Sequence, residues 1–315
     1  MISVALCTYN GEHFIKEQLE SIVNQTMPVN EIVVCDDGST DSTIQIIKSI
    51  ATQHKNIEFK IIINDNNIGV KRNFEKALIF CKGDIKFLSD QDDIWMPNKV
   101  QTVVDYFKIK KDKDVVITNA TLIDWNDICF TSKTLFECVG LDSTFLEQTN
   151  NDSLIDLFIC GNRATGATMA IKKKVRVYFD YPNEILHDYI LAIEALARNS
   201  FGIIEIPLIK YRIHNEQKCG LGDAINESWS NNIYNLVYED FHGYTLPEIF
   251  HKKITMRDKR YHWIAGLRGI FHILNNWMLY KNIYPTNWKS FISTDIRHTI
   301  INFKKRKSIK EIHEQ

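Results

Sequence analysis

The stretch "EIVVCDDGSTDSTIQIIKSIATQ", residues 31–53, contains one complete strand, turn and helix. "EIVVC" is a short apolar run of the strand type, and Gly38 permits a tight turn after it. Residues 39–41 are of the types that cap helix N-termini, and the apolar residues that follow recur on one side of a helix, at Ile44, Ile47 and Ala51. The stretch predicts a buried strand with an acidic pair, Asp36 and Asp37, at its carboxyl end.

The same unit recurs on both sides of this stretch. "ISVAL" precedes the helical pattern of "GEHFIKEQLESIVNQ", and "EFKIII" precedes that of "GVKRNFEKALIFCKG", which we expect Gly83 to close. "DIKFLS" and "DVVITNA" read as two further strands. Strands that alternate with helices of this length predict an α/β fold, a Rossmann-like, mostly parallel sheet flanked by helices. Right-handed crossovers then bring the carboxyl ends of the strands to one edge.

Composition excludes several classes of protein. The 315 residues are 44% hydrophobic and 24% charged, as in a soluble globular protein, and the net charge of -1 argues against bulk nucleic-acid binding. The seven cysteines are scattered without a C-x-x-C pair, so we expect neither a zinc site nor a disulfide framework, but a reducing, cytoplasmic environment. The sequence shows no signal peptide and no apolar run long enough to span a membrane.

Charge divides the chain into two parts. Residues 1–225 hold 24 Lys and Arg against 31 Asp and Glu, whereas residues 226–315 hold 14 against 8 and four of the six tryptophans. We therefore expect one domain over 1–225 and a helical, aromatic and basic region over 226–315. Such a mixture suits amphipathic helices at a membrane surface. The alternative is that these helices pack on the first domain or on another subunit.

Three polar clusters follow predicted strands, "CTYNG", "CDDGSTD" and "SDQDD", and so lie on the edge where open α/β sheets bind ligands. The last cluster crowds Asp90, Asp92 and Asp93 together, and a bound Mg²⁺ or Mn²⁺ would offset their repulsion. The alternative is a solvated loop in which aspartates cap the next turn. Asp36 and Asp37 have the acceptors that a base or a ribose requires, or they simply form a strand–helix corner.

Further along the chain, "HDYILAI" places Asp188 at the start of a helix, and "KYRIHNEQ" places Arg212 and His214 after a strand. The pattern alone favours a helix-capping role for Asp188, because the helix dipole stabilises a carboxylate there. It equally favours a structural role for His214.

Together, "VALCTYNGEHFIKEQLESIVNQT", "EIVVCDDGSTDST", "NIGVKRNFEKAL" and "FLSDQDDIWMPNKV" resemble glycosyltransferase family 2, whose members have the GT-A fold. The resemblance covers about residues 1–225. "SDQDDIW", "TGATMAI", "HDYILAI" and "YRIHN" resemble in particular the bacterial rhamnosyltransferase-like branch.

The resemblance implies a role for each matching residue. Asp188 would be the catalytic base of an inverting transfer, and Asp92 and Asp93 would hold the metal. The expected nucleotide-sugar-binding residues are Thr8, Tyr9, Asn10, Asp36, Arg72 and Asp90. The donor would be dTDP-rhamnose or a UDP-sugar, and the acceptor a saccharide or a lipid-linked molecule of bacterial surface polysaccharide synthesis.

This sequence departs from the processive synthases of the family, because it has no Q-x-x-R-W motif, and "YRIHNEQ" stands in the corresponding region. That favours transfer of a single sugar. The rival hypotheses are a sugar-phosphate nucleotidylyltransferase, which would need a Gly-rich loop where "CTYNGEHF" has only Gly11, and a non-catalytic nucleotide-sugar-binding module, against which the intact aspartates count.

Overall fold

The computed structural model describes residues 1–159, 161–179, 185–214, 217 and 248–249. The elements along the chain are β1 (Ile2–Thr8), α1 (Ile15–Val23), β2 (Glu31–Asp36), α2 (Thr43–Gln53), β3 (Glu58–Ile63), α3 (Val70–Phe80), β4 (Ile85–Ser89), β5 (Ile94–Trp95), α4 (Lys99–Ile109), β6 (Val115–Ile123), β7 (Cys129–Thr134), α5 (Leu135–Val139), α6 (Ser143–Glu147), α7 (Asn151–Ile159), η1 (Gly166–Thr168), β8 (Met169–Lys172), α8 (His187–Ala197) and β9 (Phe201–Arg212).

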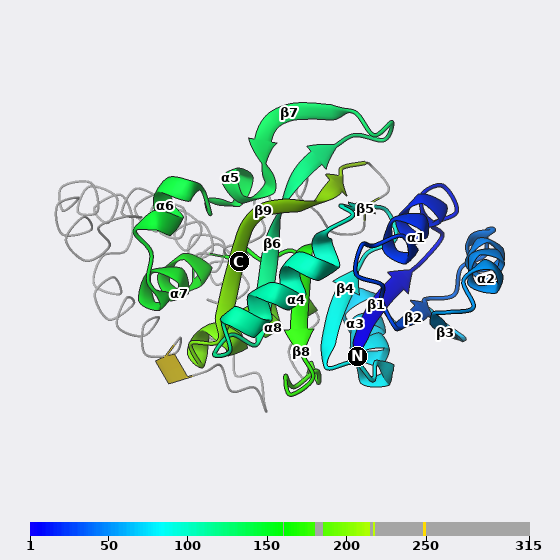
Figure 1. Ribbon diagram of the computed structural model, residues 1–315, viewed down its shortest axis with the longest axis horizontal. Coiled ribbons are helices and arrows are strands. Elements are labelled where there is room, and N and C mark those ends of the chain that lie inside the picture. Colours follow the sequence, from blue (N-terminus) through cyan, green and yellow to red (C-terminus); the bar gives the residue numbers. More distant parts are fainter. Residues whose placement is uncertain (160, 180–184, 215–216, 218–247, 250–315) are drawn as a thin grey trace, which may run out of the picture. The chain divides into compact units, whose positions relative to one another are not determined.

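The nine strands of the described part form one sheet in the order β3-β2-β1-β4-β8-β6-β9-β5, with β7 paired to β6 (Figure 1). Strands β3, β2, β1 and β4 are mutually parallel, and so are β6 and β9. Strands β8, β5 and β7 each pair antiparallel to their neighbours. The predicted α/β fold is confirmed, and the sheet is mixed rather than purely parallel, because β8 enters antiparallel between β4 and β6.

The central strands are buried along nearly their whole length. All six residues of β2 are buried, and so are the last six residues of β1. Strands covered by helices on both faces need continuous apolar runs rather than alternating ones, which is why "ISVAL" and "EIVVC" are so apolar. On α2 the buried face contains Ile47 and Ile50, whereas Ile44 and Ala51 are only half-buried, so the helix is turned slightly from its predicted orientation.

Gly83 does not close a helix, as the sequence suggested, because α3 already ends at Phe80. A Cβ atom at Gly83 would lie 2.6 Å from the backbone nitrogen of Ser3 and 2.8 Å from the carbonyl oxygen of Ile85. The glycine is therefore required where the loop after α3 passes close to the beginning of β1.

Two regions contain more structure than the sequence predicted. Helix α4 was not anticipated, although it buries Val100, Val103 and Phe107. Residues 124–159, for which the sequence predicted no helix or strand, include β7 and three short helices. The first of these, α5, begins with a capping box in which Thr134 and Glu137 exchange hydrogen bonds. Figure 1 shows α4 in front of the sheet and β7 arching above β6.

The chain divides into two compact units, residues 1–143 with 163–226 and residues 144–162 with 227–315. The sheet and every predicted site residue belong to the first unit. The predicted helical region 226–315 lies outside the described residues, apart from 248–249, and so does its proposed membrane contact. Among the described residues, no helix is long and apolar enough to cross a membrane.

Candidate active site

The three predicted polar clusters meet at one edge of the sheet. Thr8, the last residue of β1, pairs in register with Asp36, the last residue of β2. On the other side of β1, Leu6 pairs with Ser89, which ends β4. The parallel register therefore brings the loops after all three strands side by side, as the sequence predicted.

Asp36 organises the turn after β2. Its carboxylate accepts hydrogen bonds from the Thr8 hydroxyl (2.7 Å), the Ser39 backbone N–H (2.8 Å) and the Ser39 hydroxyl (2.5 Å). The side chain is fully buried. Asp36 thus ties the end of β1 to the β2–α2 turn, and its contact with a donor base stays a prediction.

Asp37 organises the loop in front of α3. Its carboxylate accepts hydrogen bonds from the N–H groups of Ile68 (2.8 Å) and Gly69 (2.9 Å) and from the Asn64 side chain (2.9 Å). Arg72 lies in the first turn of α3, and its guanidinium pairs with Glu75 at 2.5 Å. Arg72 is therefore placed by a loop that is anchored to the acidic pair, and its nucleotide-binding role stays a prediction.

Tyr9 is joined to the acidic loop through Gln91. The Tyr9 N–H donates to Gln91 Oε1 (2.8 Å), and Gln91 Nε2 donates to the Tyr9 carbonyl (3.0 Å). A Cβ atom at Gly11 would lie 2.3 Å from Gln91 Oε1, so only glycine lets the amide approach this closely. The residue between the first two aspartates of "DQDD" therefore fixes the distance between two binding loops.

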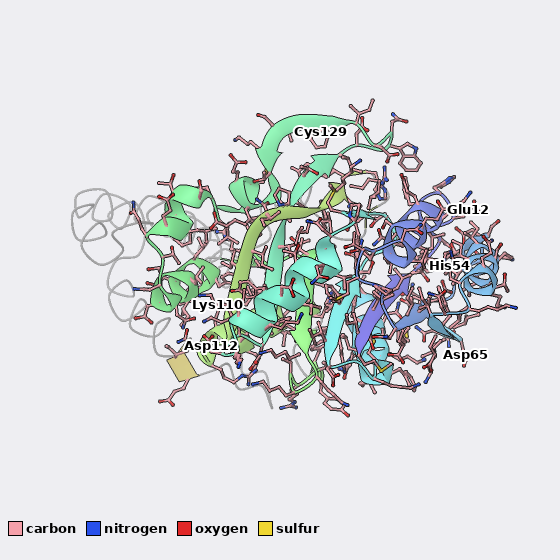
Figure 2. All side chains as sticks on the ribbon, viewed as in Figure 1. Glu12, His54, Asp65, Lys110, Asp112 and Cys129 are labelled. Atoms are coloured by element: carbon pink, nitrogen blue, oxygen red, sulfur yellow. The ribbon has the colours of Figure 1, made fainter. Side chains whose placement is uncertain are left out.

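Asn10 completes the link between the loops after β1 and β2. It adopts a positive φ of 48°, its N–H donates to the Ser39 hydroxyl (2.8 Å), and its Oδ1 accepts from the Thr40 N–H (2.9 Å). Glu12, labelled in Figure 2, adds a further bond by accepting from the Ser42 N–H at 2.9 Å. The residues "TYNG" are therefore held in place mainly by hydrogen bonds from their backbone N–H groups to side chains of neighbouring loops.

The acidic loop after β4 carries an electrostatic cost. Asp90 is half-buried, whereas Asp92 and Asp93 are 8% and 1% exposed. Burial, followed by the neighbouring charges of Asp92 and Asp188, raises the pKa of Asp90 to about 8. Burial and the same kind of repulsion also raise the pKa of Asp93 well above its usual value. The structure thus brings Asp188 into the electrostatic neighbourhood of the "DQDD" carboxylates.

Lys99, which the sequence analysis did not single out, partly balances this charge. It is completely buried, its Nζ donates to the Ala167 carbonyl (2.9 Å), and it lies 4.1 Å from the Trp95 ring centre. Burial lowers the pKa of Lys99 to about 7, while Asp93 and Asp90 act in the opposite direction. A buried lysine is strongly destabilising unless negative charge lies beside it, as it does here.

Within the described residues, no group of three or more His, Cys, Asp or Glu side chains is arranged to hold a metal ion. The loop nevertheless offers carboxylate oxygens, the ligands that Mg²⁺ and Mn²⁺ prefer. One of them, Asp93 Oδ2, is buried without a hydrogen-bond partner. The residues therefore fit a divalent cation whose other ligands come from outside the protein.

Asp188 lies in the first turn of α8 and is buried. Its Oδ1 accepts from the Tyr189 N–H (2.7 Å), and its Oδ2 accepts from the Gly166 N–H (3.1 Å) at the start of η1. The carboxylate is thus held against the segment "TGATMAI", which the sequence could not place. Asp188 thus lies in the first turn of α8, as the sequence predicted, and is also close enough to the acidic loop for its charge to raise the pKa of Asp90.

His187, the neighbour of Asp188, is a poor candidate for a base. Its ring stacks on Phe74 with 4.0 Å between centres, and neither ring nitrogen has a hydrogen-bond partner among the described residues. Burial, with a smaller contribution from Lys71, lowers the pKa of His187 to about 3. The ring is neutral at physiological pH and serves packing.

Arg212 and His214, which were not among the predicted site residues, both contact the acidic loop. His214 Nε2 lies 2.9 Å from Asp92 Oδ2, and its ring contacts Phe14 and Trp125. Arg212 donates from Nε to the Asp92 carbonyl at 2.7 Å. The position of "RIH" after a predicted strand could have indicated a role at the ligand-binding edge. Only the order of the strands in the sheet, however, brings the end of β9 near the acidic loop.

Comparison with known proteins identifies the family. Residues 3–171, more than half of the chain, match the family model described as "Glycosyl transferase family 2". The chain belongs to glycosyl transferase family 2. The matched segment includes the loops after β1, β2 and β4, so the resemblance inferred from the sequence is confirmed.

Individual relatives agree with the family 2 assignment. The dTDP-rhamnosyl transferase RfbG of Shigella flexneri is 28% identical over 229 residues, 68% of this chain and 73% of that protein. An uncharacterized glycosyltransferase of Haemophilus influenzae is 37% identical over 108 residues, which span only 33% of its length. Among solved structures, Staphylococcus aureus TarS 1–349 with UDP-GlcNAc covers 80% of this chain and 70% of its own, with 18% identity and a TM-score of 0.57. The fold of this family 2 chain is therefore GT-A.

The buried state of His187 predicts a pH effect on stability. Because the folded pKa of about 3 lies below the ordinary value of 6.5, the unfolded chain binds a proton that the folded chain excludes. The free energy of unfolding should then fall as the pH drops from 6.5 toward 3, by up to about 1.4 kcal/mol per pH unit. His187→Phe keeps a ring against Phe74 but cannot titrate, so we expect a shallower acid limb in urea unfolding. An identical pH dependence in both proteins would contradict the assignment of a neutral, buried His187.

Proposed function

We propose that this chain transfers one sugar from a nucleoside-diphosphate donor to a saccharide or lipid-linked acceptor, with inversion at the anomeric carbon, in bacterial surface polysaccharide synthesis. The observation that carries the proposal is the convergence of four features in a family 2 chain. They are the Thr8–Asp36 pair, the Tyr9–Gln91 pair, the "DQDD" carboxylates and Asp188, which surround one edge of the sheet.

The donor that we propose is dTDP-rhamnose or a UDP-sugar. Support comes from the relative named as a dTDP-rhamnosyl transferase and from TarS, whose structure contains UDP-GlcNAc. In our proposal the nucleotide binds among the residues expected from the sequence: Thr8, Tyr9, Asn10, Asp36, Arg72 and Asp90. Hydrogen bonds between backbone N–H groups and side chains tie the loops after β1, β2 and β4 to one another, which supports a binding site whose loops need little ordering by the donor.

In the proposed mechanism, Asp188 accepts the proton of the acceptor hydroxyl as that oxygen bonds to the anomeric carbon. The bond from that carbon to the donor diphosphate breaks on the opposite face, and the diphosphate leaves with the electron pair. A positioned carboxylate base contributes roughly 10²- to 10⁴-fold to such a step. One displacement inverts the centre, and no second carboxylate is required as a nucleophile.

We also propose that Asp92, with Asp90 or Asp93, holds Mg²⁺ or Mn²⁺. A divalent cation would supply charge neutralisation to the leaving diphosphate. The support within this chain is the repulsion in the loop, the buried and unpartnered Asp93 Oδ2, and the imidazole of His214 beside Asp92. A mannosyltransferase of Pyrobaculum calidifontis, similar in fold with a TM-score of 0.51, was solved with GDP-Man and Mn2+.

Metal removal and Asp92→Asn test the function and the cation together. The full chain is incubated with a panel of nucleotide sugars and candidate acceptors, and the products are identified by mass spectrometry. EDTA should abolish transfer, Mn²⁺ or Mg²⁺ should restore it, and Asp92→Asn should reduce turnover by about 100-fold or more, because the main carboxylate ligand is lost. Full activity in EDTA contradicts the metal proposal, whereas no product from any donor contradicts the function.

Asp188→Asn tests the catalytic base. The amide keeps the size of the side chain, and its single oxygen can still accept one of the two N–H bonds, from Tyr189 or from Gly166, but the group cannot take up a proton. We expect donor affinity within about threefold of the parent and turnover reduced by roughly 10²- to 10⁴-fold. His187→Phe is the matched control and should retain most of the turnover. A variant that loses donor affinity and keeps turnover would make Asp188 a binding or capping residue.

Residues 226–315 are proposed to dock this enzyme on the cytoplasmic face of a membrane. The support is their composition, an excess of basic residues mixed with four tryptophans. Each basic residue near an anionic surface contributes roughly 1 kcal/mol, so we expect the full chain to sediment with anionic liposomes at low salt and less at moderate salt. A chain truncated after residue 225 should stay in the supernatant. If the full chain also stays there at both salt concentrations, these residues pack on protein instead.

A further inference from the structure

Arg212, the last residue of β9, joins three segments that are far apart in the sequence. It is 1% exposed and is among the largest fully buried side chains of the described residues. Its backbone N–H and its guanidinium together contact the acidic loop, the turn between β6 and β7, and helix α1. Burying a charged group costs free energy, which only close hydrogen-bond and ion-pair partners can offset.

The first set of contacts fixes the acidic loop. The Arg212 N–H donates to Asp93 Oδ1 at 2.9 Å, and Nε donates to the Asp92 carbonyl at 2.7 Å. Two residues later, His214 lies beside the Asp92 carboxylate. The end of β9 therefore contacts Asp92 at both its backbone and its side chain.

The second set fixes the turn after β6, residues 124–127. Nη1 donates to the carbonyls of Asp124 (3.1 Å) and Trp125 (3.2 Å) and pairs with the carboxylate of Asp127. This turn connects β6 to β7, which begins at Cys129, the residue labelled at the top of Figure 2. The turn is thus attached to the same guanidinium as the acidic loop.

The third set fixes the beginning of α1. Nη2 donates to Glu17 Oε2 at 3.1 Å, and the guanidinium carbon lies 4.7 Å from the centre of the Phe14 ring. Phe14 in turn packs edge-on against Trp125, with 4.6 Å between ring centres. Only arginine offers five N–H donors in a fixed planar fork, together with a flat surface for an aromatic ring.

We propose that Arg212 is the positioning residue of this active site, which holds the Asp92–Asp93 loop in the geometry that the donor and its cation require and couples that loop to the β6–β7 turn. The inference rests on the proposed function as far as the donor is concerned. Because one guanidinium serves both segments, a change at the exposed side of the turn is transmitted to Asp92. Asp127 therefore influences the acidic loop without belonging to it.

Arg212→Lys tests the positioning, because lysine keeps the charge but lacks the fork. The first measurement is hydrogen exchange of the full chain without ligand, in which we expect faster exchange in both residues 90–95 and residues 124–128. The second is calorimetric titration with Mn²⁺–UDP and with Mn²⁺–dTDP, in which we expect affinity about 10- to 100-fold weaker. Arg198→Lys is the matched control, since Arg198 forms an exposed ion pair with Glu194 and should change neither measurement.

Asp127→Asn tests the coupling without removing a buried charge, since its side chain is 44% exposed. We expect faster exchange in residues 90–95 and weaker Mn²⁺–nucleotide binding, and we expect both effects to shrink when the change is made in the Arg212→Lys background. Equal effects in both backgrounds, or a response confined to residues 124–128, overturn the coupling. Unchanged exchange in the acidic loop of Arg212→Lys overturns the positioning role.

These measurements separate this inference from the proposed function. Exchange reports the coupling without any nucleotide, so coupled loops in a chain that binds neither Mn²⁺–UDP nor Mn²⁺–dTDP would contradict the function and the donor-related part of the role only. Normal nucleotide binding by the parent and by Arg212→Lys alike would overturn the positioning role and leave the function standing.

Discussion

The contacts of the candidate active site are arranged around the carboxylates that crowd together at the end of β4. Asp90, Asp92 and Asp93 follow a buried strand, and Asp188 approaches from α8. Each carboxylate loses solvent and meets like charge, which is why the pKa values of Asp90 and Asp93 are raised. Such a loop persists only where the surrounding fold supplies compensating charge and hydrogen bonds.

Two buried cations provide part of that compensation. Lys99, the first residue of α4, interacts electrostatically with Asp93 and Asp90, and Arg212 contacts the loop from the end of β9. Neither neutralises the cluster fully, since Asp93 Oδ2 keeps no partner among the described residues. The negative charge that remains supports the divalent cation that we propose for this edge.

The binding loops are organised by hydrogen bonds to one another more than by their own secondary structure. Asp36 ties β1 to the β2–α2 turn, Asp37 holds the loop before α3, and Gln91 bridges to Tyr9. The motif "CDDGSTD" therefore also has a structural function, because its aspartates hold neighbouring loops in place within the protein. Preformed loops lower the entropic cost of binding a flexible nucleotide sugar.

The sequence predicted the alternation of strands and helices, because apolar periodicity and caps are local. It also placed "TYN", "DDGSTD" and "DQDD" on one edge, since parallel strands joined by right-handed crossovers leave no other arrangement. It did not predict α4. It also wrongly predicted that Gly83 closes a helix, because the need for glycine there depends on how closely a loop passes Ser3, which is not a local property.

Which distant residues contact the acidic loop depends on the order of the strands in the folded sheet. Antiparallel β8 and the parallel pair β6–β9 set where Gly166, Arg212 and His214 lie, and strand order is not written in the periodicity of any one segment. His187 and Asp188 are neighbours in the sequence, yet one stacks on Phe74 and the other faces Gly166. Their different chemistry follows from burial and partners, which a chain acquires only when it folds.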